Sequence, residues 1–252
     1  MNIQYCSDLH LEFIKNTYFL HSNLLIPSAD ILILAGDIIP FCKSLDKVKY
    51  FDFLSESFQK VYWLPGNHEY YNSDMVRGNM FKGKKVRNNV HIVNNEVISI
   101  NEVNLIFSTL WSQISPQKEL IIKSRLSDFS QITYDGDAFR PKQFNILHQE
   151  SLRFLENSLI DLNGNKNLVV THHVPTLLNY PKEYLTSPIN EAFAVELFDL
   201  IEKYQPEAWI YGHSHFNTPE FSIGKTRLVT NQLGYVDMNE HKSFRFDSFI
   251  SL

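Results

Sequence analysis

Five short segments of the chain are apolar at nearly every position and rich in β-branched or aromatic residues. They are residues 3–6, 31–35, 61–64, 168–171 and 208–211. Such runs are typical of strands buried on both faces, because a strand with one solvated face alternates apolar and polar residues. The pattern therefore predicts five central strands that pair in parallel.

Segments of helical period separate several of these strands. Apolar residues recur every three or four positions in residues 43–58, in residues 141–161 and after Pro188, where the apolar side extends over residues 194–204. Strands that alternate with amphipathic helices predict a layered α/β fold.

Two regions, residues 90–110 and 216–250, instead show strand after strand, which predicts partly antiparallel additions to the sheets. Two mixed sheets packed together, with helices outside, satisfy both patterns. Residues 111–140 form a polar stretch with charges and aromatic residues, which we interpret as a surface excursion. No repeat or linker interrupts the chain, so we expect a single domain over residues 1–252.

The composition is that of an ordinary globular protein, with 44% hydrophobic and 20% charged residues. The chain has neither the roughly 18 to 20 apolar residues of a membrane span nor the pattern of a signal peptide, so we expect a cytoplasmic protein without a membrane partner. The net charge of −5 argues against stable nucleic-acid binding, and nothing in the sequence indicates an oligomeric state. Cys6 and Cys42 are expected to be buried, reduced thiols.

Each of the five predicted strands ends in a short polar motif. The motifs are SDLH at 7–10, GD at 36–37, PGNHE at 65–69, HH at 172–173 and GHSH at 212–215. The carboxyl ends of parallel strands are where open α/β sheets bind their ligands. We therefore expect the five motifs to converge on one site.

The side chains in these motifs are of the kinds that bind divalent cations. Asp, His and Asn without Cys suit hard or borderline ions such as Mn²⁺, Fe²⁺ or Zn²⁺. Asp8 and His10 are two residues apart, as are His213 and His215, so both members of a pair project to one side of an extended segment. The motifs therefore predict a metal centre.

The ordered motifs D-x-H, G-D, G-N-H-E, H-H and G-H-S-H resemble the signature of the calcineurin-like metallophosphoesterases over residues 8–215. The resemblance implies a four-layer α-β-β-α sandwich with two divalent metal ions, Mn²⁺ by preference, with Fe²⁺, Zn²⁺ or a mixture as the other choices. It also implies metal-dependent hydrolysis of a phosphomonoester or a phosphodiester in a small phosphorylated substrate.

The same resemblance implies a role for each motif residue. One ion is held by Asp8, His10 and His215, the other by Asn67, His172 and His213, and Asp37 bridges them. The chain offers both His172 and His173, and the family's H-H-x-P arrangement selects the first. His68 resembles the histidine that meets the substrate, where it would donate a proton to the leaving oxygen or stabilise charge on that oxygen. Glu69 or Asp37 would orient the imidazoles.

Two cations about 3.5 to 4 Å apart clamp phosphate oxygens and lower the pKa of a shared water, so that hydroxide forms near neutral pH. A fold of this family that has lost hydrolysis and serves as a binding or scaffold module is the alternative, although no ligand is replaced here. An oxidoreductase with a His/Asp iron centre fits the Asn and the bridging carboxylate poorly.

The residues Arg125, Asp128, Tyr134 and Arg140 are interpreted as solvated loop residues rather than as a pocket rim.

Overall fold

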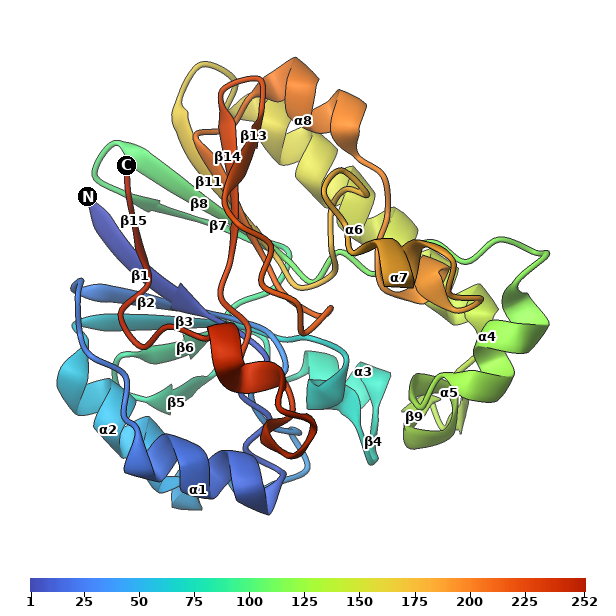
Figure 1. Cartoon of the computed structure of the whole chain (residues 1–252), viewed down its shortest axis with the longest axis horizontal. Helices are drawn as coiled ribbons and strands as arrows, with labels where there is room; N and C mark the ends of the chain where they lie inside the picture. Colours follow the sequence, from blue (N-terminus) through green and yellow to red (C-terminus); the bar gives the residue numbers. More distant parts are fainter.

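The computed structural model describes all 252 residues, and two six-stranded sheets form its centre (Figure 1). The first sheet has the order β15-β1-β2-β3-β6-β5 and the second β13-β14-β12-β11-β8-β7. In each sheet the four middle strands are parallel and the two edge strands antiparallel. The bounds are β1 Asn2–Cys6, β2 Ile31–Ala35, β3 Lys60–Leu64, β5 Lys85–Arg87, β6 Val90–Ile92, β7 Glu96–Ile100, β8 Val103–Ser108, β11 Lys166–Thr171, β12 Ala208–Tyr211, β13 Phe221–Ile223, β14 Thr226–Thr230 and β15 Phe249–Ser251.

The apolar runs are explained by burial on both faces of each sheet. In β2, Ile31 and Ile33 pack into the core between the two sheets, whereas Leu32 and Leu34 face the outer helices. β12 follows the same rule, since Ile210 points between the sheets. Because successive side chains of a strand point to opposite faces, a strand covered on both sides needs an apolar residue at every position. The five predicted central strands are confirmed.

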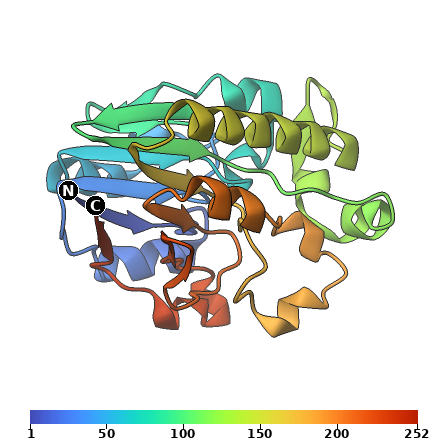
Figure 2. The same ribbon diagram turned by 90° about the horizontal axis from the view of Figure 1, so that it is seen from above.

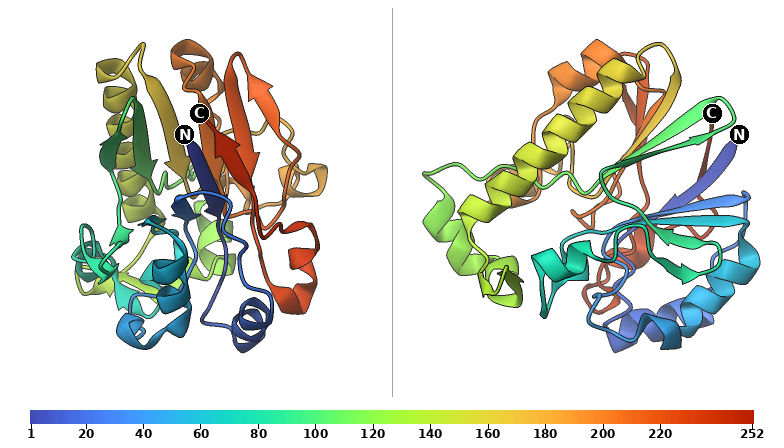
Figure 3. Two further views of the ribbon diagram at one scale, coloured as in Figure 1. Left: turned by 90° about the vertical axis from the view of Figure 1, so that its left-hand side faces the viewer. Right: turned by 180° about the vertical axis from the view of Figure 1, so that it is seen from behind.

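Helices cover the outer face of each sheet (Figure 3). The first sheet packs against α1 (Ile14–Ser22) and α2 (Lys49–Ser57), and the second against α6 (Pro141–Asp161) and α8 (Phe198–Tyr204). The result is the expected four-layer α-β-β-α sandwich of two mixed sheets. It places the carboxyl ends of the parallel strands of both sheets side by side.

The helix predictions hold to different degrees. The helix over residues 141–161 is confirmed and begins with Pro141, a residue suited to the first helical turn. Only Lys49–Ser57 of the segment 43–58 is α-helical, and α1 was not predicted. The third helix begins only at Phe198, because the segment before it is tied to the loop after β11: Ala194 forms a β-bridge with Val174, and the Glu196 carboxylate accepts hydrogen bonds from Thr176 Oγ1 and the Leu177 amide.

Residues 111–140 lie at the periphery of the molecule but also contribute to the core (Figure 2). Trp111, Ile122 and Phe139 are fully buried. The segment forms four short elements, α4 Glu119–Arg125, α5 Asp128–Gln131, β9 Ile132–Tyr134 and β10 Asp137–Ala138.

The remaining short elements lie elsewhere in the chain. They are α3 Met75–Asn79, α7 Lys182–Leu185, β4 Ser73–Asp74 and the 3₁₀ turns η1 Leu45–Lys47, η2 His68–Tyr70, η3 Asn190–Ala192, η4 Val236–Met238 and η5 Glu240–Ser243. β10, β9 and β4 form a third, small sheet.

Two smaller expectations have separate outcomes. No helix combines the length and the apolar character needed to cross a bilayer. Cys6 is buried and unpaired as expected, but Cys42 is exposed, so the prediction of a buried thiol is wrong there. Cys42 lies in the loop after β2, seven residues beyond the end of that buried strand at Ala35.

Candidate metal centre

The loops after β1, β2 and β12 bring a first group of ligand-type side chains together. The ligand atoms of Asp8, His10, Asp37 and His215 all lie within 4.8 Å of one another. His10 Nε2 is 3.0 Å from His215 Nε2 and 3.8 Å from Asp37 Oδ2, and Asp8 Oδ1 is 3.5 Å from His215 Nε2. All four side chains are largely buried.

The loops after β2, β3, β11 and β12 form a second group around the same aspartate. His172 Nε2 lies 3.3 Å from Asp37 Oδ1, 3.3 Å from Asn67 Oδ1 and 3.1 Å from His213 Nδ1. The two carboxylate oxygens of Asp37 therefore face different groups. All seven predicted ligands lie at this one place, and Asp37 is the residue that both groups share.

Hydrogen bonds at the outer nitrogen of each imidazole determine what its inner nitrogen offers. The outer partners are Glu12 Oε1 for His10 Nδ1 at 3.1 Å, Glu240 Oε2 for His215 Nδ1 at 2.7 Å, the Ala35 carbonyl for His172 Nδ1 at 2.9 Å and the Ala192 carbonyl for His213 Nε2 at 3.4 Å. Each partner is an acceptor, so the outer nitrogen keeps its proton and the inner nitrogen is the one that can exchange its proton for a cation. Ring nitrogens and carboxylate oxygens that converge in this way fit a bound cation.

The electrostatics of the centre also favour positive charge. Burial disfavours the charged form of His172, but the Asp37 carboxylate outweighs burial and raises the pKa of His172 to about 9. Burial acts in the same way on His215, where Asp8 and Glu240 raise the pKa to about 10. The two buried carboxylates, Asp8 and Asp37, thus create a negative potential, and bound divalent cations would compensate their charge.

Five of the clustered side chains stand on backbone in the left-handed region. The φ angles are 56° at Asp8, 47° at His10, 57° at Asp37, 73° at His213 and 52° at His215. This conformation is uncommon outside glycine, and it turns each side chain off the end of its strand into the centre. The close approach of the loops adds a second requirement, because a Cβ at Gly36 would overlap His172 and one at Gly66 would overlap Asp37.

Glu69 has a different role from the predicted one. Its carboxylate does not touch an imidazole, but accepts hydrogen bonds from the amides of Asp37, Ile38 and Gly66, at 3.0, 2.7 and 2.6 Å, and from Trp63 Nε1 at 2.9 Å. Burial, followed by the nearby Asp37 carboxylate, raises the pKa of Glu69 to about 7. Glu69 therefore fixes the two loops that carry Asp37 and Asn67, and the expectation that it orients imidazoles is wrong.

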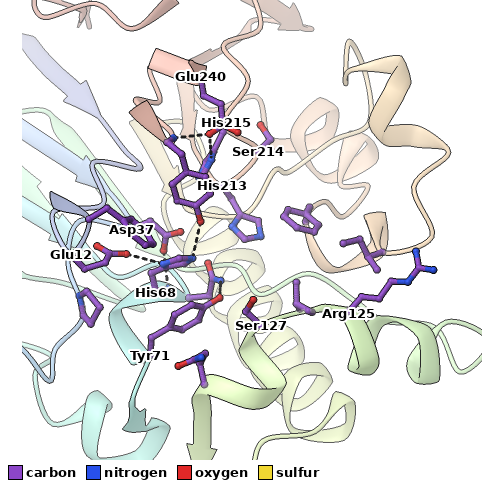
Figure 4. A pocket seen from close by; sticks show the side chains of 18 of the residues that line it. Glu12, Asp37, His68, Tyr71, Arg125, Ser127, His213, Ser214, His215 and Glu240 are labelled. Atoms are coloured by element: carbon purple, nitrogen blue, oxygen red, sulfur yellow. Dashed lines mark hydrogen bonds and ion pairs between the residues drawn. The ribbon is translucent and has the colours of Figure 1, made fainter. Parts of the chain in front are cut away.

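Glu12 performs the orienting role that was assigned to Glu69 or Asp37. Its Oε1 lies 3.1 Å from His10 Nδ1. The same oxygen lies 2.9 Å from His68 Nδ1 (Figure 4). Glu12 continues the spacing of two that links Asp8 and His10, and this spacing was a usable signal that the sequence analysis missed. Glu240 was missed as well, because it follows the last motif by 25 residues with no local pattern.

His68 lies beside the two groups and lines the pocket, and its ring forms a third cluster with Glu12 and His10, whose ligand-type atoms lie within 4.8 Å of one another. Tyr71 stacks on its ring at a centroid distance of 4.0 Å, and Tyr235 Oη lies 3.5 Å from His68 Nε2. Burial opposes protonation, but the carboxylates of Asp37 and Glu12 outweigh burial and raise the pKa of His68 above its ordinary value. His68 thus combines a fixed ring with an environment that favours a proton.

The structure distinguishes between the two adjacent histidines. His172 Nε2 faces the second group, whereas the ring of His173 packs 4.2 Å from His213 and 5.3 Å from Trp111. The Nε2 of His173 is buried without a partner, and burial, followed by the charge of His172, lowers the pKa of His173 well below its ordinary value. Of the two histidines, His172 is therefore the candidate ligand, because its Nε2 reaches the centre.

A cavity of about 730 Å³ opens in front of the centre. Figure 4 shows Glu12 and His68 on one side of it and Arg125 on the far side. Phe13, Tyr184 and Phe193 supply aromatic walls. Of the four residues interpreted as solvated, Arg125 is exposed as expected but also lines this pocket. Asp128 is fully buried, so the interpretation is wrong there, and Tyr134 and Arg140 do not line the pocket.

Four layers around a cluster of Asp, His and Asn side chains define a metallophosphoesterase fold. Residues 1–217 match the family model of the calcineurin-like phosphoesterases, and the chain therefore belongs to this family. The two clusters are candidate ligand groups for the two divalent ions that the family typically binds.

Three known proteins illustrate the relationship. An uncharacterized protein of Acanthamoeba polyphaga mimivirus is 33% identical over 278 residues, which cover 99% of this chain and 96% of that protein. The phosphopantetheinyl hydrolase of Mycobacterium tuberculosis has a TM-score of 0.72 and 19% identity, covering 97% of this chain and 94% of its own. A dimetal phosphatase from Danio rerio has a TM-score of 0.52 and 14% identity, covering 92% and 87%. The two solved structures show similarity of fold.

Proposed function

We propose that this chain is a dinuclear metal-dependent phosphoesterase that hydrolyses a phosphomonoester or phosphodiester bond in a small phosphorylated substrate. The observation that carries the proposal is the arrangement of four imidazoles, each tied at its outer nitrogen, whose inner nitrogens converge with carboxylate and amide oxygens around Asp37. Two divalent cations bound there would polarise phosphate oxygens and make a water molecule acidic enough to react near neutral pH.

The protein's own residues supply the other functions. In the proposal one cation is held by Asp8, His10 and His215. The other is held by Asn67, His172 and His213, and Asp37 binds both cations. His68 Nε2 faces the pocket and donates a proton to the leaving oxygen, while Glu12 fixes the ring from the opposite nitrogen. The Glu12 carboxylate also orients His10, so one side chain aligns a ligand and the proton donor.

Metal loading and turnover test the proposal together. After removal of metal and addition of Mn²⁺, Fe²⁺ or Zn²⁺, we expect occupancy close to two ions per chain and hydrolysis of p-nitrophenyl phosphate or its diester. A chelator should abolish turnover, and re-addition of Mn²⁺ should restore it. Two bound ions without turnover on any ester would support the scaffold alternative, and no bound ion would contradict the metal centre.

The pocket supports a substrate larger than inorganic phosphate. Its 730 Å³ lie within the range of roughly 300 to 1,000 Å³ that holds metabolite-sized or drug-sized ligands. A panel of phosphorylated metabolites should include phosphopantetheine compounds, because one structural relative is named for that group. The proposal includes a cytoplasmic location and no membrane partner. It also includes no stable nucleic-acid partner, which the net charge of −5 supports.

Arg125 is proposed to recognise a second anionic group on the substrate. Arg125 lines the pocket on the wall opposite Glu12. Arg125→Ala should raise KM by roughly 2- to 5-fold for esters that carry a further acidic group, as expected for a partly solvated ion pair. KM for p-nitrophenyl phosphate should not change. Lys123→Ala, a charge loss on the same helix outside the pocket lining, is the control, and equal effects of the two variants would contradict this role.

A further inference from the structure

Asp128 is a buried carboxylate that contacts a predicted metal ligand. It is the first residue of α5 in the segment 111–140, and only 1% of its surface is exposed. Its Oδ1 accepts hydrogen bonds from Asn67 Nδ2 at 2.8 Å and from Tyr71 Oη at 2.7 Å. Burial of a carboxylate costs folding free energy unless hydrogen bonds compensate for the lost hydration. These two hydrogen bonds compensate for part of that cost, and they link Asp128 to the metal centre.

The hydrogen bond from Asn67 determines which end of its amide faces the centre. The amide has a donor end and an acceptor end of nearly equal shape, and only the oxygen end can bind a cation. Asp128 Oδ1 accepts its hydrogen bond from the nitrogen end of the amide, which leaves Asn67 Oδ1 directed toward His172 Nε2, 3.3 Å away. The Tyr71 hydroxyl, at 3.4 Å from Asn67 Nδ2, is the more distant neighbour.

We propose that Asp128 is a positioning residue of the metal centre, which holds the Asn67 amide with its oxygen toward the cation shared with His172 and His213. The inference rests on the proposed function, because it assigns Asn67 as a ligand. It also gives the segment 111–140 a role, because the two residues that precede Asp128, Leu126 and Ser127, line the pocket. The same short segment therefore forms the substrate wall and supports one metal ligand.

Metal binding, rather than activity alone, tests this role. Asp128→Leu keeps the size of the side chain and removes the acceptor. We expect it to weaken Mn²⁺ binding by about 10- to 100-fold at one of the two positions, which is the usual loss for a partner that orients a metal ligand. Asp128→Asn keeps an acceptor oxygen and should retain most of the affinity. The measurements are Mn²⁺ titration by calorimetry and metal analysis after dialysis.

Three controls separate positioning from a general effect on the fold. Tyr71→Phe removes the other donor to the same oxygen and should leave both ions bound. Asp137→Leu changes an exposed aspartate of the same segment and should have no effect. In the double variant, Asp128→Leu should add no further loss to Asn67→Ala, because both changes act through one amide.

The outcomes are distinct. Absence of metal binding in the wild-type protein would overturn the proposed function itself. Two ions in the wild type and two in folded Asp128→Leu at unchanged affinity would overturn only the positioning role, as would additive losses in the double variant. If Asp128→Leu does not give the circular dichroism of the wild type, Asp128→Ala removes the same acceptor without apolar bulk, and the same two results decide.

Discussion

Asp37→Ala is expected to abolish hydrolysis and to lower the occupancy of both metal positions together. Asp37 Oδ2 faces His10 in the first group, and Asp37 Oδ1 faces His172 in the second. Removal of this carboxylate takes a ligand from each cation and leaves the two positive charges less screened from one another. Turnover should fall by more than about 100-fold, the upper end of the loss caused by removing an outer partner of a ligand. Metal analysis after dialysis and turnover of p-nitrophenyl phosphate measure the two effects.

The interpretation of this variant needs a check on folding, because Asp37 Oδ1 also accepts the backbone N–H of His68 at 2.9 Å. Asp37→Asn retains a side chain of the same shape and an acceptor oxygen for that hydrogen bond, but it lacks the negative charge. It should therefore keep the wild-type circular dichroism and still lose both ions. Asp135→Ala, at an exposed position, is the matched charge control. Full metal content in folded Asp37→Asn would place the bridge elsewhere.

His68→Ala should retain both metals and still reduce turnover. The Nδ1 atom of His68 faces Glu12, and its Nε2 atom lies 3.5 Å from the hydroxyl of Tyr235, another residue that lines the pocket, so the ring is proposed as a proton donor to the leaving group. Loss of this transfer should lower turnover by roughly 10²- to 10⁴-fold on an alkyl phosphate. A p-nitrophenyl ester should suffer least, because its leaving group is already stable as an anion. Turnover on both esters, with metal content measured in parallel, shows the difference.

Asn67→Ala is the control for His68, because the two residues are adjacent and only one is a proposed ligand. This variant should bind metal more weakly and recover part of its turnover when Mn²⁺ is added. Metal loss in His68→Ala would instead make His68 a ligand. Unchanged turnover of His68→Ala on alkyl esters would leave it with a structural role, in which the stacked Tyr71 and the Glu12 carboxylate serve only to fill the pocket wall.

The arrangement of the centre was predictable because it depends on strand ends, which the sequence marks clearly. A strand buried on both faces is apolar throughout, so the change from Ala35 to Gly36-Asp37 is visible without any structure. Parallel pairing then brings such ends together. His172 and His213 are distant in the chain, yet they follow β11 and β12, which are neighbours in the sheet. His172 Nε2 and His213 Nδ1 therefore lie 3.1 Å apart.

The supporting residues were not predictable to the same degree, because long-range packing decides their contacts. Asp128 and Glu240 reach the centre from segments that show no periodic pattern, and each contacts a motif residue far away in the chain. Glu69 stands inside a motif, but its partners are backbone amides, which no side-chain pattern reveals. The late start of α8 has the same origin, because Glu196 bonds to residues 176 and 177 across a loop.

The left-handed backbone at Asp8, His10, Asp37, His213 and His215 has a consequence for the stability of the protein. Each non-glycine residue in that conformation costs about 1 kcal/mol, and glycine would adopt the same turn without the steric penalty. Eight other non-glycine residues adopt the same region elsewhere in the chain, so the conformation is not confined to the candidate metal centre. At the centre, however, it occurs at five clustered residues, which therefore hold their side chains in place at a cost in folding free energy.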